Sequence, residues 1–423
     1  MVGHFVIFVC LLLGSATGVV DAFQPPTDDS RVLASGRTPH RPRLSSVRAS
    51  ATPADVDAQP RASPRTGPAQ MLLNAALSSP LWKYLLVPQA RANIVKTAEA
   101  NGIQWNRALA WIREQDGPWK EGGGVPEGLK ESYPSYYTKP FHAYEEGNLS
   151  WDAAFEQELA GRAVGARNFP SFGEAGEEAF RSAFDVALDS LGADVPRGGI
   201  VVDLGCGTGT STRRIARRYP TASRVMGIDM SPYFVEVGKR LLELSPRGAG
   251  EGGQWVTTIE PDDRIELCVG DATSTGLPDG CVDVCVVGLV VHELPPEVSI
   301  EVCAEAKRLL KPGGQLWIYE MDFDSPAFAS QRSNALLFSL IRSTEPYLDE
   351  YADGCALVRE HLMETFEDVK LTAATGRHYA LVATKGDKKS EVGKRPIEDT
   401  RFNDDGTYAV NDTHLKTWES KED

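Results

Sequence analysis

The sequence predicts an α/β fold, in which a doubly wound parallel sheet follows an N-terminal helical extension. From residue 198 onward, short apolar runs alternate with segments whose apolar residues have helical spacing. One of these runs, Cys281 to Val291, is apolar at nearly every position, as expected for a strand buried on both faces. The first run leads directly into a glycine-rich loop, which is typical of a strand that enters a ligand site.

The individual elements follow from the same patterns. Right-handed crossovers place the ends of successive parallel strands at one edge of a sheet, where ligands bind. A favoured N-cap, Ser231, begins the second helix, and the sequence Lys-Pro-Gly-Gly at 311–314 ends the third. The final two strands are expected to form an antiparallel hairpin. The expected strands are 200–204, 224–229, 264–270, 281–291, 315–321, 368–375 and 379–384, and the expected helices between them are 211–218, 231–244 and 296–310.

The first 70 residues are expected to be a two-part targeting sequence. Residues 1–22 contain a short apolar run followed by small residues, as in a signal peptide; a membrane anchor is the alternative. Residues 23–70 are rich in Ser, Pro, Ala and Arg and lack Glu, which is typical of a disordered transit peptide. The step from Ala22 to Phe23 resembles the cleavage motif of plastid presequences in algae with complex plastids. We expect the plastid stroma, with the endomembrane system as the alternative.

The remaining chain is divided by composition. Residues 71–170 are expected to form a helical extension that caps a substrate site, residues 171–385 the α/β domain, and residues 386–423 a polar flexible tail. The net charge of −15 argues against nucleic acid as a partner. No pair of the seven cysteines has CxxC spacing, so no metal site is expected. No stable membrane span is expected in the mature chain.

The strongest chemical signal is the loop from Gly205 to Gly209, with Asp203 just before it. Its three glycines allow a sharp turn and a close approach to a ligand. A dinucleotide site needs G-x-G-x-x-G, but here the third glycine comes one residue early. A carboxylate at Asp203 would repel a pyrophosphate, whereas it suits the cationic amino end of a methionine moiety. The loop therefore favours S-adenosylmethionine over NAD.

Two further acids follow neighbouring strands. Asp229 ends the second strand, where a carboxylate accepts hydrogen bonds from ribose hydroxyls. Enzymes that use NAD have the same device, so Asp229 alone does not discriminate between the two cofactors. Asp271 follows the third strand and is placed to reach an adenine amino group.

These motifs occur in the order found in class I, Rossmann-like S-adenosylmethionine-dependent methyltransferases, which residues 198–384 resemble. The resembling motifs are 201–209, 227–231, 270–272 and 310–314. The resemblance implies a seven-stranded sheet whose last strand is antiparallel. The aromatic segment 136–151 also resembles that of uncharacterised methyltransferases from plants and photosynthetic microbes. By resemblance, the cofactor-binding residues are Asp203, Gly205, Cys206, Gly207 and Gly209 for the methionine part, Asp229 for the ribose, and Met230, Asp271 and Ala272 for the adenine.

Methyl transfer requires little of a protein beyond alignment and a dry site, and a base only if the acceptor must lose a proton. His292 and Glu293 follow the fourth strand and are the candidate catalytic residues, with His292 expected to face the methyl group. The alternative is a loop histidine that bonds the backbone. Glu320 and Asp322, at the end of the fifth strand, are further candidates or else a solvated strand end. The Asp/Asn-Pro-Pro-aromatic motif for methylating amide or adenine nitrogens is absent here.

Aromatic residues before the α/β domain are candidates for the acceptor pocket. They are Tyr136, Tyr137, His142 and Tyr144. The alternative is an aromatic cluster that packs the extension onto the core. Four arginines at 213, 214, 217 and 218 are expected to form a solvated helix face.

Together these features predict an S-adenosylmethionine-dependent methyltransferase that acts by in-line transfer on a small-molecule acceptor in the plastid. The first alternative is a methyltransferase that modifies proteins and uses the N-terminal extension for docking. The second is a non-catalytic protein that binds S-adenosylmethionine or assists assembly. A nicotinamide oxidoreductase is a more distant alternative.

Overall fold

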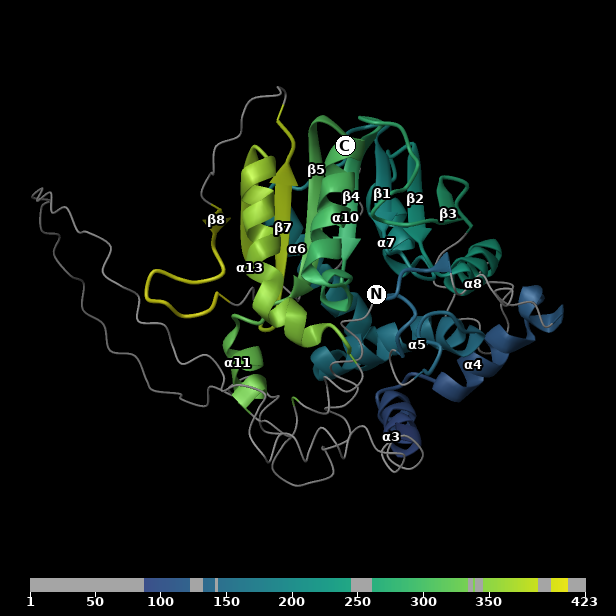
Figure 1. Cartoon of the computed structure of the whole chain (residues 1–423). Coiled ribbons are helices and arrows are strands. Elements are labelled where there is room, and N and C mark those ends of the chain that lie inside the picture. Colours follow the sequence, from purple (N-terminus) through teal and green to yellow (C-terminus); the bar gives the residue numbers. More distant parts are fainter. Residues whose placement is uncertain are drawn as a thin grey trace, which may run out of the picture.

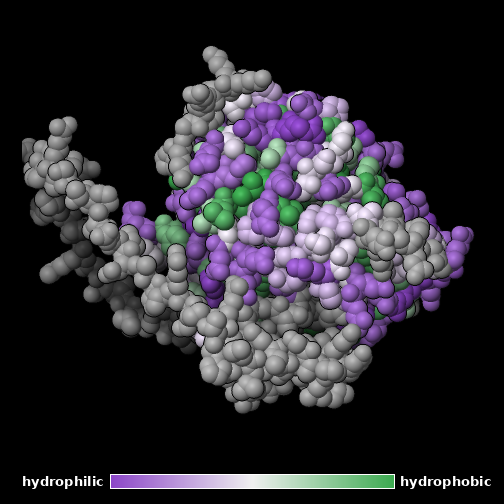
Figure 2. Space-filling model, viewed as in Figure 1, coloured by the Kyte–Doolittle hydropathy of each residue, from purple (hydrophilic) through white to green (hydrophobic). Residues whose placement is uncertain are grey.

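The computed structural model describes residues 87–121, 132–140, 144–244, 261–333, 338, 345–386 and 397–409. The predicted signal and transit peptides and the candidate residue His142 lie outside this part of the chain. In the described ranges, no helix combines the length and the apolar character that crossing a bilayer requires. The visible face of the molecule is mainly hydrophilic, with small groups of hydrophobic residues scattered over it (Figure 2).

A mixed eight-stranded sheet with the order β3-β2-β1-β4-β5-β7-β6-β8 forms the centre of the fold (Figure 1). Strands β1 to β5 are parallel, and β7 runs antiparallel to both of its neighbours, β5 and β6. The predicted α/β sheet with an antiparallel last strand is therefore confirmed, and β8 is an addition to it. The strands are β1 (Ile200–Leu204), β2 (Arg224–Asp229), β3 (Ile265–Val269), β4 (Val282–Gly288), β5 (Leu310–Met321), β6 (Asp368–Thr375), β7 (His378–Thr384) and β8 (Glu398–Asp399).

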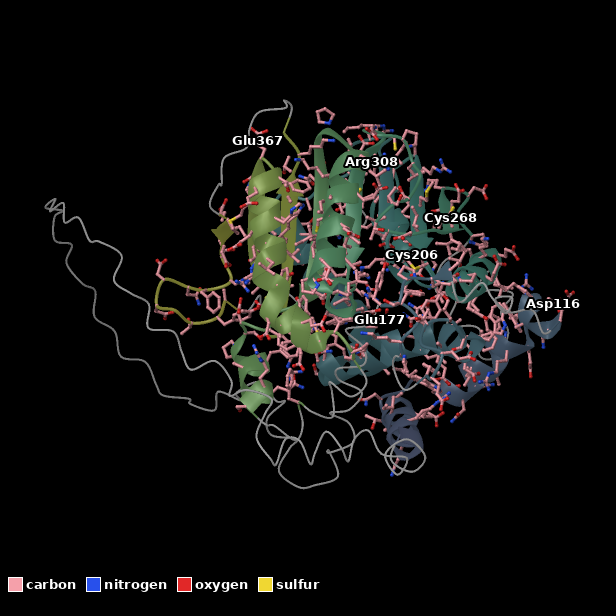
Figure 3. All side chains as sticks on the ribbon, viewed as in Figure 1. Asp116, Glu177, Cys206, Cys268, Arg308 and Glu367 are labelled. Carbon is pink, nitrogen blue, oxygen red and sulfur yellow. The ribbon has the colours of Figure 1, made fainter. Side chains whose placement is uncertain are left out.

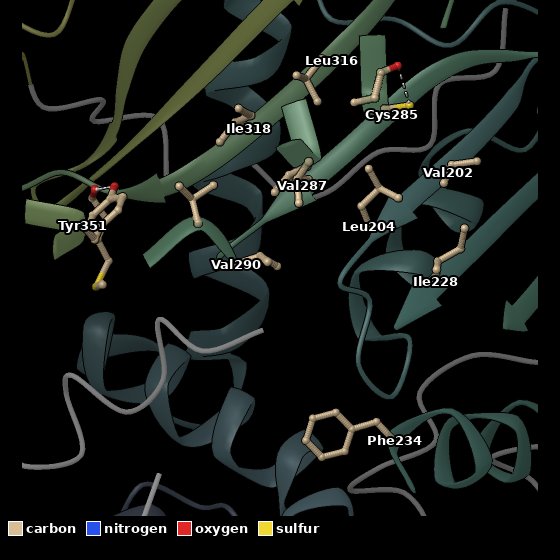
Figure 4. Packing of buried hydrophobic residues seen from close by; sticks show 14 of the residues in the cluster. Val202, Leu204, Ile228, Phe234, Cys285, Val287, Val290, Leu316, Ile318 and Tyr351 are labelled. Carbon is tan, nitrogen blue, oxygen red and sulfur yellow. Dashed lines mark hydrogen bonds between the residues drawn. The ribbon is translucent and has the colours of Figure 1, made fainter. Parts of the chain in front are cut away.

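Helices cover both faces of the sheet, because side chains alternate between the faces along each strand. In β5, Trp317 packs in a cluster with α6 and α7, whereas Leu316 and Ile318 pack in a second cluster with α10 and α13 (Figure 4). Ser231 caps α8 as predicted, by accepting a hydrogen bond from the amide of Phe234. The described helices are α3 (Val87–Ala100), α4 (Trp105–Glu114), α5 (Trp151–Asn168), α6 (Gly176–Ser190), α7 (Thr210–Arg218), α8 (Pro232–Glu243), α10 (Pro296–Leu309), α11 (Pro326–Ser333) and α13 (Leu348–Thr365), with short 3-10 turns η3 (Pro118–Glu121), η5 (Pro170–Ala175) and η6 (Val291–Glu293).

The N-terminal helices α3, α4 and α5 lie at the carboxyl ends of the parallel strands (Figure 1). The backbones of α5 and α6 are in direct contact where the two helices cross, at Gly165 of α5 and Gly176 of α6. A Cβ atom on Gly165 would lie 2.1 Å from the Cα atom of Glu177, and one on Gly176 would lie 2.3 Å from the Cα atom of Ala166. Side chains larger than hydrogen would separate the two helices, so these glycines fix α5 closely against α6.

The arginines of α7 do not form a solvated face, so that prediction is wrong. Arg213 and Arg218 are 5% and 8% exposed. Arg213 pairs with Glu158 of α5, and Arg218 pairs with Asp189 of α6. Arg214 also pairs with acids of α6. Acidic side chains from distant segments neutralise the charge run, which makes its burial possible.

Residues 397–409 likewise differ from the polar flexible tail expected for 386–423. They add β8, which pairs in parallel with β6. Arg401 is 4% exposed and bonds Asp322 and Asp399, and the hydroxyl of Tyr408 donates to Asp322 as well. The many charged residues of this segment predict a solvated tail. In the structure, its acidic and basic side chains instead pair with each other and with Asp322 of the α/β domain. The remaining residues of the predicted tail, 387–396 and 410–423, lie outside the described ranges.

Replacement of Arg401 by Met should lower the free energy of unfolding by about 3–5 kcal/mol, since Asp322 is 1% exposed and would lose its cationic partner. Chemical denaturation measures the change. The control is Arg224→Met, which removes an exposed pair with Glu266 and should cost less than about 1 kcal/mol. A loss for Arg401→Met no larger than that of the control would contradict a buried ionic attachment.

Candidate functional site

A cleft with about 540 Å³ of empty space lies at the carboxyl ends of the parallel strands, where the strand order reverses between β1 and β4. Its position is the usual one for ligands of open α/β sheets. The lining residues come from five strand ends or helices and from the N-terminal extension. They are Tyr136, Tyr137, Asn148, Gly205, Ile228, Asp229, Met230, Gly270, Asp271, Ala272, Thr273, Val290, Glu293, Leu294, Val298 and Val302.

The glycine loop forms one wall of the cleft because its backbone turns sharply from β1 into α7. Gly205, Gly207 and Gly209 have φ values of 76°, 59° and 83°, in the left-handed region that favours glycine. The amide of Gly205 donates to the carbonyl of Ile228 at 2.8 Å, which attaches the loop to the end of β2. A Cβ atom on Gly205 would lie 2.7 Å from the side chain of Val290, so a larger residue would not fit between β1 and β4.

Asp229 lines the cleft, and its carboxylate also bonds to the glycine loop. It is 6% exposed and accepts hydrogen bonds from the amides of Gly207 and Ser231, each at 2.8 Å. Burial raises the pKa of Asp229 to about 6, although the two amide donors oppose this shift. The hydroxyl of Tyr137 lies 3.5 Å from its Oδ1 atom. A carboxylate in this position is suited to bind ribose hydroxyls.

The other predicted cofactor-binding residues divide into two groups. Met230, Asp271 and Ala272 line the cleft, and the Oδ1 atom of Asp271 accepts hydrogen bonds from the amide and hydroxyl of Thr273. Asp203 does not line it: this carboxylate is 1% exposed and accepts hydrogen bonds from the hydroxyls of Ser211 and Thr212, each at 2.7 Å. Asp203 therefore fixes the first turn of α7 to β1.

The remaining three loop residues of the prediction, Cys206, Gly207 and Gly209, are also absent from the cleft lining. Cys206, which is labelled in Figure 3, belongs to the loop after β1. It is buried and packs in a small cluster with Val235 and Leu267. Its role in the described structure is packing.

The predicted aromatic residues also divide. Tyr136 and Tyr137 line the same cleft as Asp229 and Asp271, so they lie beside the cofactor-binding acids. Burial, together with the charge of nearby Asp271, raises the pKa of Tyr136 to about 12, so its hydroxyl keeps its proton. Tyr144 does not line the cleft; it donates a hydrogen bond to Glu156 and thereby packs the extension, as the alternative interpretation had it.

The two candidate catalytic residues have different environments. His292 is fully buried, does not line the cleft, and places its Nδ1 atom 2.7 Å from Oε1 of Glu320. Glu293 does line the cleft. Burial, and then the nearby charges of Asp229 and Glu320, raise the pKa of Glu293 well above its usual range, against a hydrogen bond from Asn148. Glu293 can therefore contact a ligand, and its raised pKa favours the protonated form of its carboxyl group. His292 does not line the cleft, and a catalytic role for either residue stays a prediction.

Glu320 and Asp322 are not a solvated strand end, because they are 0% and 1% exposed. Glu320 bonds both the ring and the backbone amide of His292, which fixes the turn η6 next to β5. Asp322 is the partner of Arg401. Neither residue lines the cleft.

Leu289 shapes the site through its backbone conformation, which no pattern in the sequence predicts. Leu289 has a φ of 57° and is the one residue other than glycine with a positive φ in the described part of the chain. This conformation costs about 1–2 kcal/mol for a residue with a Cβ atom. It lies directly between the end of β4 and Val290, where the chain turns so that Val290 and Glu293 line the cleft. Backbone strain of this kind is common where a loop forms a ligand site.

Comparison with known proteins shows which family the residues around the cleft resemble. Residues 202–318 match the family model of a methyltransferase domain. This match spans β1 to β5, the parallel part of the sheet, so residues 202–318 are similar to a methyltransferase domain in sequence and have its α/β topology. The match supports S-adenosylmethionine as the cofactor. Gly205, Asp229 and Asp271 line one cleft, and their contacts with that cofactor stay a prediction. No cluster of three or more His, Cys, Asp or Glu side chains in the described ranges is arranged to hold a metal ion.

Two curated relatives match the chain over about a third of their own lengths. An uncharacterised 37.1 kDa protein in transposon TN4556 of Streptomyces fradiae is 34% identical over 149 residues, which is 35% of this chain and 37% of the relative. The 2-methyl-6-phytyl-1,4-hydroquinone methyltransferase of Synechocystis sp. is 35% identical over 129 residues, which is 30% of this chain and 33% of the relative. A solved structure of a putative S-adenosylmethionine-dependent methyltransferase from Methanococcus maripaludis is 15% identical, covers 57% of this chain and 95% of its own, and has a TM-score of 0.36.

The affinity of the methyltransferase domain for its cofactor should increase as the pH rises through 6. Below that pH Asp229 is protonated, and above it the ionised carboxylate accepts hydrogen bonds from the ribose hydroxyls. Calorimetric titration with S-adenosylhomocysteine between about pH 5 and pH 7 should show Kd falling roughly tenfold. The variant Asp229→Asn should bind more weakly at every pH and lack this dependence. The same pH dependence in that variant would assign the titration to another group.

Proposed function

We propose that this protein transfers the methyl group of S-adenosylmethionine to an uncharged, largely apolar small molecule. The charge of the cleft is the observation that carries this proposal. Asp229 and Asp271 line it, and none of its described lining residues is Lys or Arg. Carboxylates attract the cationic sulfonium of the cofactor, and the same field disfavours an anionic acceptor.

The apolar part of the lining narrows the acceptor further. Val290 and Leu294 follow β4, Val298 and Val302 lie on α10, and aromatic rings contribute from the extension. Such a surface suits an aromatic ring or an alkyl chain, which bury well against valine, leucine and tyrosine. The Synechocystis relative is named for a phytyl-substituted hydroquinone, and this supports a hydroquinone-like acceptor.

The residues of the chain have modest chemical tasks in such a reaction. The bound cofactor supplies an activated methyl group, so the protein mainly aligns the acceptor and excludes water. The raised pKa of Glu293 favours the protonated carboxyl group, which can donate a hydrogen bond to an acceptor oxygen. The hydroxyl of Tyr136 also keeps its proton and can donate in the same way. These two donors suit an acceptor that carries neutral oxygen atoms.

Methyl transfer to neutral acceptors is tested by incubating the purified chain with cofactor labelled in its methyl group. A hydroquinone with an apolar side chain should yield a labelled, solvent-extractable product. A matched hydroquinone with a carboxylate on its side chain should show kcat/KM lower by about tenfold or more. Equal rates for both acceptors would contradict the charge argument. Label in the protein fraction would support the protein-modifying alternative, and binding without turnover would support the non-catalytic one.

We also propose that the chain acts in the plastid stroma. An apolar run with small residues after it, then an Arg-rich segment without Glu that begins at Phe23, support this location.

Residues 1–70 fused to a fluorescent protein test the location in an alga with complex plastids. Fluorescence should accumulate in the plastid. Substitution of Phe23 by Ala, which leaves the apolar run intact, should leave the fusion outside the stroma. Fluorescence in the endomembrane system with the unaltered segment would contradict the proposal and support the alternative.

A further inference from the structure

Two adjacent residues of α5, Gln157 and Glu158, contact the glycine loop from outside the segment that matches the methyltransferase family. The Oε1 atom of Gln157 accepts a hydrogen bond from the amide of Thr208 at 2.7 Å. The Oε2 atom of Glu158 accepts from the hydroxyls of Thr208 at 3.3 Å and Thr210 at 2.8 Å. The N-terminal extension therefore contacts both the backbone and the side chains of the loop.

The part of the contact that Glu158 makes is buried and charged. Glu158 is 4% exposed and Thr208 is fully buried. The guanidinium of Arg213 lies 2.5 Å from the same carboxylate oxygen. Burial favours the neutral acid, but Arg213 and Arg162 hold the pKa of Glu158 below its usual range. In this setting a charge-assisted hydrogen bond is stronger than a neutral one, and leaving one partner unsatisfied is costly.

Support from α5 is important because of where Thr208 lies. It stands between Gly207 and Gly209, two glycines with left-handed backbones that are free to adopt many other conformations. Two successive loop amides are fixed by side-chain acceptors from distant parts of the chain. Asp229 accepts from the amide of Gly207, and Gln157 accepts from the amide of Thr208. The shape of the loop thus depends on one acceptor from the sheet and one from the extension.

Helix α5 is itself well anchored. Gly165 and Gly176 bring its backbone against α6, whose residues Phe180 and Phe184 are buried against the sheet. Just before α5, the carbonyl of Asn148 accepts a hydrogen bond from the hydroxyl of Ser231 at 2.6 Å. With these attachments at both ends, α5 holds Gln157 and Glu158 at a fixed distance from the loop.

We propose that Gln157 and Glu158 are positioning residues for the cofactor, and that α5 is an integral part of the cofactor site. In this arrangement the extension holds the loop in the shape that receives S-adenosylmethionine. The inference rests on the proposed function, because it concerns the same cleft and the same cofactor. It differs from the predicted role of the extension, which was to cap the substrate.

The test compares the Kd for S-adenosylhomocysteine, measured by calorimetry on the full chain, among matched variants. Gln157→Met keeps the length of the side chain but removes the acceptor, and should raise Kd about tenfold. Gln157→Glu keeps an acceptor for the amide of Thr208 and should restore affinity to within about threefold. The control is Asp152→Asn on the same helix, whose exposed side chain should leave Kd unchanged.

A role in fold stability alone would not produce this pattern. Thermal unfolding should show the folded state for every variant that is titrated. With saturating cofactor, kcat of Gln157→Met should stay within about twofold of the wild type while KM for the cofactor rises. An unchanged Kd for Gln157→Met would overturn the inference for Gln157.

A second variant keeps the inference falsifiable if Gln157→Met does not fold. Thr210→Val preserves the shape of the side chain but removes the hydroxyl that donates to Glu158. It should raise Kd by about threefold, and an unchanged Kd would overturn the positioning role of Glu158. Failure of the wild-type chain to bind S-adenosylhomocysteine would instead overturn the proposed function.

Discussion

The turn from β1 into α7 is the constraint on which the rest of the site depends. Three residues in the left-handed conformation within five positions bring the loop backbone against β2 and β4. The side chain of Val290 fills the space that a Cβ atom on Gly205 would need, and Asp229 accepts a hydrogen bond from the loop itself. The first of these features requires that Gly205 has no side chain. The cleft, its acids and its contacts with the extension all follow from this close approach.

Acidic and basic residues lie on different sides of this turn. The acids Asp229 and Asp271 line the cleft side. The basic residues of α7 lie on the other side of the loop, where acids of α5 and α6 neutralise them. Because the arginines are paired and buried, their charge does not offset the acidic field of the cleft. A cationic cofactor and a neutral acceptor are the ligands that such a field favours.

The sequence predicts most of the sheet because the apolar residues of each strand and helix recur with a regular local spacing. It also predicts the glycine loop and Asp229, because these residues directly follow β1 or end β2 in the sequence. Features that depend on pairs of distant residues were missed. Glu158 and Arg213 are 55 residues apart, and Asp322 and Arg401 are 79 apart. Charged residues taken without their distant partners are typical of solvated segments, so the sequence predicts a solvated face for the arginines of α7 and a flexible tail for 386–423. His292 and Glu293 are neighbours in the sequence, but the turn η6 and the strained backbone at Leu289 give them opposite surroundings.

The short strand β8 has a consequence for how copies of the protein meet. An open sheet offers unpaired amides and carbonyls at its outer strands, and these are templates for association with another chain. Strand β8 pairs with β6 at Lys370 and Leu371, and the ionic network of Arg401 secures the residues that follow it. At this border the sheet ends in a two-residue strand. The C-terminal segment therefore protects the sheet against edge-to-edge aggregation on that side.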